Sequence, residues 1–114
     1  MRVLGFSKKW PKLSMDEFTT FRFPRKDTDW QVGEIVQIVY HPRSNKDREI
    51  IGTAKIIIKQ PYCLKPTGSY LYPTQEDAEA DGFPDVDQFL DFFYESYGDR
   101  IFSEPMNKLT LEKL

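Results

Sequence analysis

The sequence predicts one α+β domain, and three features indicate it. β-branched and aromatic residues alternate with polar residues through most of the first 60 positions. Two helical patterns follow between positions 74 and 98, and a short alternating run lies near the last residue. With 114 residues, 39% of them hydrophobic, the chain can form one core but is too short for two. We therefore expect a single domain over residues 1–114.

Two β-rich runs separated by a basic, polar connection are the clearest strands. The first covers residues 18–23, and its period of two divides the side chains between two faces. Phe18, Thr20 and Arg22 share one face, and Thr19, Phe21 and Phe23 share the other. The second run covers residues 32–40, is apolar on both faces and is therefore expected at the centre of a sheet.

Three further segments complete the predicted sheet. Residues 2–6 form a short opening strand, and Pro11 then predicts a loop or one helical turn. In residues 50–59 the alternation places five side chains inward: Ile50, Gly52, Ala54, Ile56 and Ile58. After an irregular stretch over residues 60–73, a last strand is expected around Leu109 and Leu111.

Capping residues set the limits of the two helices. Thr74 is a good N-cap with acidic residues in the first turn, and Gly82 provides the stop. Asp85 caps the second helix, with Gln88 three positions later, and Gly98 ends it. The second helix has an apolar stripe that we assign to the core. It consists of Val86, Phe89, Leu90, Phe93 and Tyr97.

The net charge of −2 hides an uneven distribution. Residues 1–48 carry a net +4, whereas residues 49–114 carry a net −6. The basic half is where we expect an anionic partner, with several cations in predicted loops. Ordinary surface solvation explains most charge runs equally well.

Several classes of protein and site are not expected. No apolar run is long enough to span a membrane, and the first residues lack a signal peptide, so we expect a cytoplasmic protein. A single cysteine, Cys63, cannot form an internal disulfide, and one histidine gives little basis for zinc. We expect a buried Cys63, no metal and no cofactor.

A hydroxyl and a guanidinium on one face of an otherwise core-type strand require a reason. Thr20 and Arg22 either look into a binding cleft, or Arg22 pairs with an acidic residue of the second half. Trp10 lies among Lys8, Lys9 and Lys12, a composition used to stack a base beside phosphates, although it could equally cover the core.

The order of these segments resembles the ASCH domain family, a branch of the PUA-like superfold. The resemblance extends from about Leu4 to Leu114. Its short motifs are Phe18-Thr-Thr-Phe-Arg22, Val32-Gly-Glu34, Gly52-Thr-Ala-Lys55 and Ala78-Glu-Ala-Asp-Gly-Phe83. It implies a small, partly open β-barrel of about five to six strands, flanked by short helices.

The family resemblance also implies functions. Members are thought to bind RNA in a cleft beside the helices, and some resemble amidohydrolases that act on acylated cytidine or have been described as ribonucleases. The amidohydrolase chemistry uses a lysine, a threonine and an acid, of which the last two correspond to Thr20 and Asp81. The lysine position holds Glu17, which cannot supply a positive charge. Lys12 could enter the cavity instead, and the sequence does not decide whether it does.

We carry three hypotheses. The first is an RNA- or nucleotide-binding module whose contacts are Lys8, Lys9, Trp10, Lys12, Thr20, Arg22, Arg25, Lys26 and Tyr40. The second is a small hydrolase using Thr20 with Asp81 or Glu17 as base. The third is a regulatory domain that binds a peptide or metabolite, with Tyr62, Tyr70 and Tyr72 as a surface. No specific protein partner is predicted.

Overall fold

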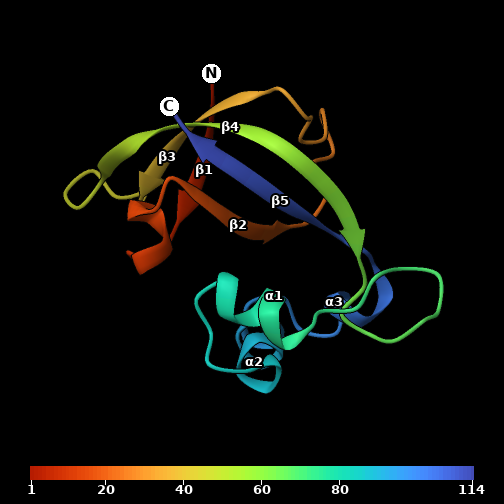
Figure 1. Cartoon of the computed structure of the whole chain (residues 1–114). Helices are drawn as coiled ribbons and strands as arrows, with labels where there is room; N and C mark the ends of the chain where they lie inside the picture. The colour runs from red at the N-terminus through yellow and green to blue at the C-terminus, as the bar shows by residue number, and fades with distance from the viewer.

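Five strands form one mixed sheet in the computed structural model, which describes residues 1–114 (Figure 1). They are β1 (Arg2–Phe6), β2 (Glu17–Arg22), β3 (Ile35–Tyr40), β4 (Glu49–Tyr62) and β5 (Met106–Lys113). Their order in the sheet is β1-β3-β4-β5-β2, with β1 parallel to β3 and every other pair antiparallel. The two edge strands, β1 and β2, do not pair. The sheet is therefore not closed, and the expected barrel is not confirmed.

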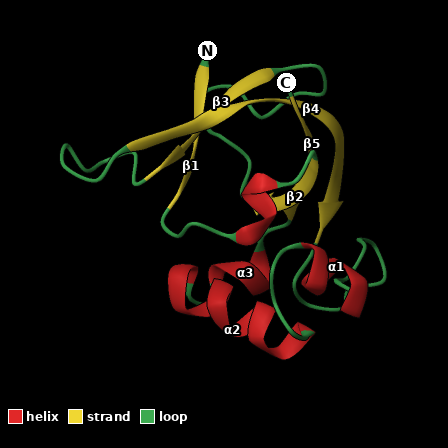
Figure 2. Cartoon of the chain, turned by 60° about the vertical axis from the view of Figure 1, so that its left-hand side comes forward, coloured by secondary structure: helices red, strands yellow, loops and turns green.

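Four helices connect the strands. A short 3-10 helix, η1 (Pro11–Ser14), precedes β2, and α1 (Gln75–Ala80), α2 (Val86–Tyr97) and α3 (Arg100–Ser103) lie between β4 and β5. The three α-helices gather at one end of the sheet (Figure 2). None of the helices is long and apolar enough to cross a membrane.

The predicted caps of the helices are confirmed. The Thr74 hydroxyl accepts a hydrogen bond from the Asp77 amide at 3.1 Å, and the Asp77 carboxylate accepts one from the Thr74 amide at 2.9 Å. Asp85 accepts a hydrogen bond from the Gln88 amide, and Gly98 ends α2 with a φ of +64°. The local sequence signals for helix limits were therefore sufficient here.

The strand predictions were wrong in two respects: where β3 begins, and which face of β4 two isoleucines occupy. Val32 is 61% exposed, because β3 begins only at Ile35. Ile50 and Ile58 are 54% and 45% exposed, although the alternation placed both inward. The ladders of β4 slip by one residue at Ile51 and at Ile57. Each bulge inserts one residue and reverses which face the following side chains occupy.

β2 separates two hydrophobic clusters rather than bordering one core. Phe18 belongs to a cluster inside the curved sheet, with Leu4, Val36 and other strand residues. Phe21 and Phe23 belong to a second cluster against the helices, which includes Phe89 and Phe93 of α2. Trp10 packs against both clusters. The predicted division of β2 into two faces is confirmed, and its polar residues lie where the two clusters leave a gap.

Candidate functional site

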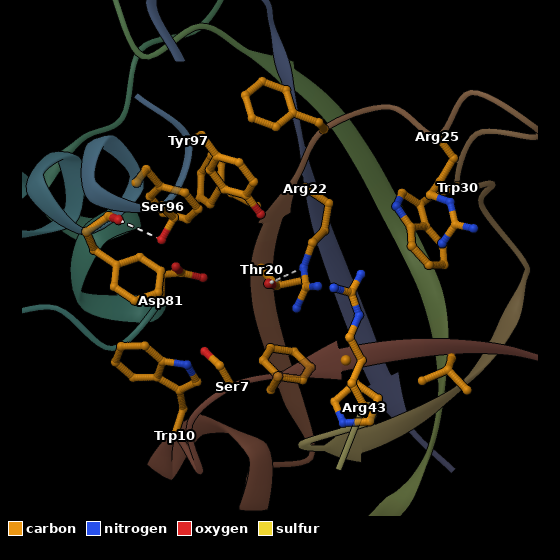
Figure 3. A pocket seen from close by; sticks show the side chains of 18 of the residues that line it. Ser7, Trp10, Thr20, Arg22, Arg25, Trp30, Arg43, Asp81, Ser96 and Tyr97 are labelled. Atoms are coloured by element: carbon orange, nitrogen blue, oxygen red, sulfur yellow. Dashed lines mark hydrogen bonds between the residues drawn. The ribbon is translucent and has the colours of Figure 1, made fainter. Parts of the chain in front are cut away.

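A cavity of about 1180 Å³ opens in this gap, beside the edge strands β1 and β2 (Figure 3). Side chains reach it from β1, η1, β2, the turn after β3, the end of α1 and α2. Its lining includes six cationic residues, Lys12, Arg22, Arg25, Lys26, Arg43 and Arg100, and two acidic residues, Asp27 and Asp81. Their formal charges give the cavity a net +4, although the whole chain carries −2. An anion is therefore favoured at this surface.

Lys12 and Asp81 form the buried base of the cavity. The Lys12 ammonium lies 2.7 Å from the Asp81 carboxylate and donates a second hydrogen bond, of 2.8 Å, to the Thr19 carbonyl on the β2 edge. Burial lowers the pKa of Lys12 and raises the pKa of Asp81 to about 6, against the attraction between the two groups. Asp81 thus exchanges its proton near neutral pH.

The backbone after α1 explains how Asp81 reaches this position. Asp81 is the C-cap of α1, and Gly82 follows it with a φ of +104°, a conformation that favours glycine. A Cβ atom at Gly82 would lie 3.0 Å from the Trp10 ring. The indole of Trp10 therefore lies directly against this turn and lines the cavity beside Asp81.

Arg22 extends from β2 into the cavity without a carboxylate partner. Its Nε donates a 3.3 Å hydrogen bond to the Thr20 hydroxyl, and its guanidinium lies 4.6 Å from the centre of the Phe6 ring. None of the seven ion pairs in the structure includes Arg22. Burial lowers the pKa of Arg22 from its ordinary value. The alternative expectation, that Arg22 pairs with an acidic residue, is wrong.

The other cations surround the cavity mouth. Arg25 makes a weak exposed contact of 3.4 Å with Asp27, and Arg100 pairs with Glu104 at 2.6 Å. Lys26 and Arg43 form no ion pair. Exposed side chains such as these can turn toward a ligand at low cost, because surface ion pairs stabilise little.

Aromatic rings supply the apolar part of the lining. Trp10 and Tyr97 lie across the cavity from Arg22, and Trp30 lies beside Arg25 (Figure 3). Trp30 is buried between two guanidinium groups, with Arg2 at 4.5 Å and Arg25 at 5.5 Å from the ring centre. Its indole N–H is buried and has no hydrogen-bond partner.

Seven of the predicted site residues line this one cavity. They are Trp10, Lys12, Thr20, Arg22, Arg25, Lys26 and Asp81. Four others do not line it. Lys8 lies over the Trp10 ring, and Glu17 is exposed opposite Glu112 in the ladder of β2 and β5. Lys9 and Tyr40 line a separate small hollow, where Lys9 pairs with Glu49 at 2.6 Å.

Sequence reasoning missed several lining residues. Arg43 and His41 come from a turn that the sequence marked only as basic and polar, and Tyr97 comes from a helix stripe assigned wholly to the core. Arg100 lies in α3, a helix that was not predicted. The tyrosines proposed as a partner surface do not form one cluster, because Tyr62 is buried while Tyr70 and Tyr72 are exposed.

The net positive charge, the aromatic rings and the buried Lys12–Asp81 ion pair therefore all lie in one cavity. No family model, no curated protein and no solved structure matches the chain.

Proposed function

We propose that the chain binds single-stranded RNA or a nucleotide in this cavity, as an ASCH-type domain would. The observation that carries the proposal is the unpaired guanidinium of Arg22, half-buried in a cavity with a net positive lining. A charge removed from water is costly unless a partner of opposite sign compensates it. In this site an anionic ligand provides that partner.

The aromatic residues support a nucleic acid over a simple anion. Unstacked bases bind by stacking on aromatic side chains, and cations beside those rings contact the phosphates. Trp10 and Tyr97 lie on one side of the cavity, with Arg22 and Arg43 on the other (Figure 3). A recessed cavity of this kind accepts a single strand, whereas a duplex needs a broader surface.

Salt dependence tests this proposal. Five cations of the lining form no buried ion pair and are available to phosphates. They are Arg22, Arg25, Lys26, Arg43 and Arg100. For about five phosphate contacts on a single strand, the slope of log K against log salt is near −3.5. Calorimetric titration with a short single-stranded RNA at several salt concentrations measures it, and Arg22→Gln reduces the affinity. A flat salt dependence contradicts the proposal.

We infer a hydrolase as the second candidate, on the strength of the Lys12–Asp81 pair beside Thr20. Thr20 is buried, and the carboxylate of Asp81 faces the same part of the cavity (Figure 3). The amidohydrolase resemblance calls for a lysine where the sequence has Glu17; Lys12 supplies an ammonium next to Asp81 from η1. A carboxylate with a pKa of about 6 suits a general base near neutral pH.

In this candidate reaction Thr20 Oγ1 attacks the acyl carbon of an acylated cytidine, and Asp81 accepts the hydroxyl proton. Lys12 or Arg22 stabilises the oxyanion, and Asp81 returns the proton to the departing amine. Water then hydrolyses the acyl-threonine ester. The hydroxyl of Thr20 is hydrogen-bonded to Arg22 and not to Asp81, so the substrate must align them. Release of cytidine from N4-acylated cytidine, followed by chromatography, tests this candidate.

A further inference from the structure

Arg22 has more hydrogen-bond donors than the protein uses. The only hydrogen bond of its guanidinium joins Nε to the Thr20 hydroxyl, which leaves the four N–H groups of the two Nη atoms free. Neither Nη atom takes part in a hydrogen bond, and the Arg22 side chain lines the cavity. The two Nη groups form the planar fork that binds phosphate oxygens in pairs.

Arg43 reaches the same cavity from the turn after β3 (Figure 3). This turn is fixed to β1 by a 2.9 Å hydrogen bond from the His41 amide to the Phe6 carbonyl. His41 has a φ of +48°, and its carbonyl accepts a hydrogen bond from the Ser44 amide. The backbone that carries Arg43 is therefore ordered even though its side chain is exposed and has no ion pair.

Pro42 adds a steric contact that holds the turn. A Cβ atom on Gly5 of β1 would lie only 2.6 Å from Pro42 Cγ, so the ring packs directly against the glycine. The position of Arg43 thus depends on a glycine in a different strand.

The charges around these two arginines specify the kind of anion. Lys12 and Asp81 compensate each other as an ion pair at neutral pH, so Arg22 and Arg43 together supply +2 of the net +4 of the lining. A phosphodiester within a strand carries one negative charge. A phosphomonoester carries about −1.5 to −2 at pH 7 and has three acceptor oxygens. The monoester therefore matches both the charge and the number of free donors better.

We propose that Arg22 and Arg43 form a subsite for a phosphomonoester dianion, carried by a mononucleotide or by the phosphorylated end of an RNA strand. This proposal rests on the proposed binding function and specifies its ligand. Arg22 binds two phosphate oxygens through its fork, Arg43 closes over the group from the turn, and the base reaches the rings of Trp10 or Tyr97. On an RNA strand, such a subsite recognises the phosphorylated end and not the phosphodiesters within the strand.

The test compares ligands that differ only in the phosphate. Calorimetry at fixed pH and salt measures a pentanucleotide with a 5′-hydroxyl, a 5′-phosphate or a 3′-phosphate, together with cytidine, cytidine 5′-monophosphate and its methyl ester. We expect the matching phosphomonoester to bind about 10- to 100-fold more tightly than its hydroxyl counterpart, as charge-assisted hydrogen bonds to a dianion imply. The methyl ester, a monoanion, loses most of this gain.

Three variants locate the effect. Arg22→Gln and Arg43→Gln both remove the preference for the phosphomonoester. Arg43 is exposed, so its variant keeps the fold even if Arg22→Gln does not. Arg48→Gln is the matched control, because Arg48 is a nearby exposed arginine that lines the other hollow and not the cavity. It leaves the preference unchanged.

The outcomes separate the two proposals. If all three pentanucleotides bind equally and Arg22→Gln weakens each of them, RNA binding stands and the phosphomonoester subsite is wrong. If no RNA binds but cytidine 5′-monophosphate binds in an Arg43-dependent manner, the subsite stands and the RNA proposal is wrong. The subsite is overturned if the phosphomonoester strengthens binding of neither the nucleoside nor the pentanucleotide. If the phosphomonoester strengthens the binding of only the nucleotide or only the oligonucleotide, that molecule is the natural carrier of the phosphate.

Discussion

Lys12 and Asp81 lie 69 positions apart in the chain, yet their side chains form a buried ion pair with 2.7 Å between Nζ and Oδ1. The pair joins η1 to the end of α1 across the base of the cavity. Each residue is almost fully buried, and each is the main compensation for the charge of the other. Stability and the net charge of the cavity therefore depend on the same two groups.

Breaking the pair on one side destabilises the fold. Lys12→Met leaves the carboxylate of Asp81 buried without a counter-ion, for which we expect a loss of about 3–5 kcal/mol in the free energy of unfolding at pH 7.5. Urea denaturation measures it. The double variant Lys12→Met/Asp81→Leu recovers most of the loss, because no buried charge remains. Lys9→Met is the control, since the Lys9–Glu49 pair is exposed, and no measurable change is expected. Equal effects of Lys9→Met and Lys12→Met contradict this account.

For the proposed RNA binding, we expect the affinity to rise as the pH falls through 6. The pKa of Asp81 is raised to about 6, so between pH 7.5 and 5 its carboxylate becomes neutral and the cavity gains about one positive charge. Lys12, Arg22 and Lys108 stay charged around it. One unit charge at about 8 Å in a half-solvated site changes the binding free energy by about 1 kcal/mol, or about fivefold in affinity.

The measurement uses an RNA without a terminal phosphate, so that the ligand itself does not titrate, at constant ionic strength. Asp81→Asn removes the pH dependence. His41→Gln keeps it and excludes the sole histidine, which also lines the cavity, as its source. An unchanged pH profile in Asp81→Asn means that another group is responsible.

Thr20→Val separates binding from hydrolysis. Valine has nearly the shape of threonine, so we expect the fold to persist. Loss of the hydroxyl frees Arg22 Nε and lowers the RNA affinity without abolishing it, whereas any release of cytidine from an acylated cytidine stops. Thr19→Val is the matched control one residue away. The hydroxyl of Thr19 is buried without a hydrogen-bond partner, and its removal leaves activity and stability intact or improves stability. Turnover that survives Thr20→Val rules out Thr20 as the nucleophile.

Gly5→Ala acts on the cavity from a distance. The new methyl group would lie 2.6 Å from Pro42 Cγ, which is closer than van der Waals contact allows, so the turn that carries Arg43 must move. We expect the preference for a phosphomonoester to fall about tenfold, while the affinity for an unphosphorylated strand changes less. Calorimetry with the paired oligonucleotides measures both values. Gly68→Ala is the control for lost stability: its φ of +78° makes alanine strained there, but residue 68 is outside the cavity, so the preference is expected to persist.

Local signals in the sequence predicted most of the fold. The caps at Thr74 and Asp85, the stops at Gly82 and Gly98 and the two faces of β2 all depend on neighbours within a few positions. The outward positions of Ile50 and Ile58 could not be predicted, because the bulges at Ile51 and Ile57 depend on the partner strands. A period of two has no means of indicating where a ladder slips.

In the candidate site, too, some residues could be predicted from local sequence signals and others could not. Thr20 and Arg22 stood out because polar side chains occupied one face of an apolar strand. Lys12 could not be assigned to the site, because its burial depends on Asp81, which ends α1 and lies 69 positions later in the sequence. Arg43 looked like any cation in a polar turn, since the contacts of His41 and Pro42 with β1 are what bring it to the cavity.

The order of strands in the sheet also determines when the site can exist during synthesis. The only sheet neighbour of β2 is β5, which is synthesised after the other four strands of the sheet. Until then β2 has no hydrogen-bonded partner, and Phe18, Phe21 and Phe23 have nothing complete to pack against. Thr20 and Arg22 are therefore synthesised early but reach their final positions only when β5 pairs with β2. A nascent chain that stops before Met106 contains the lining residues but cannot form the cavity.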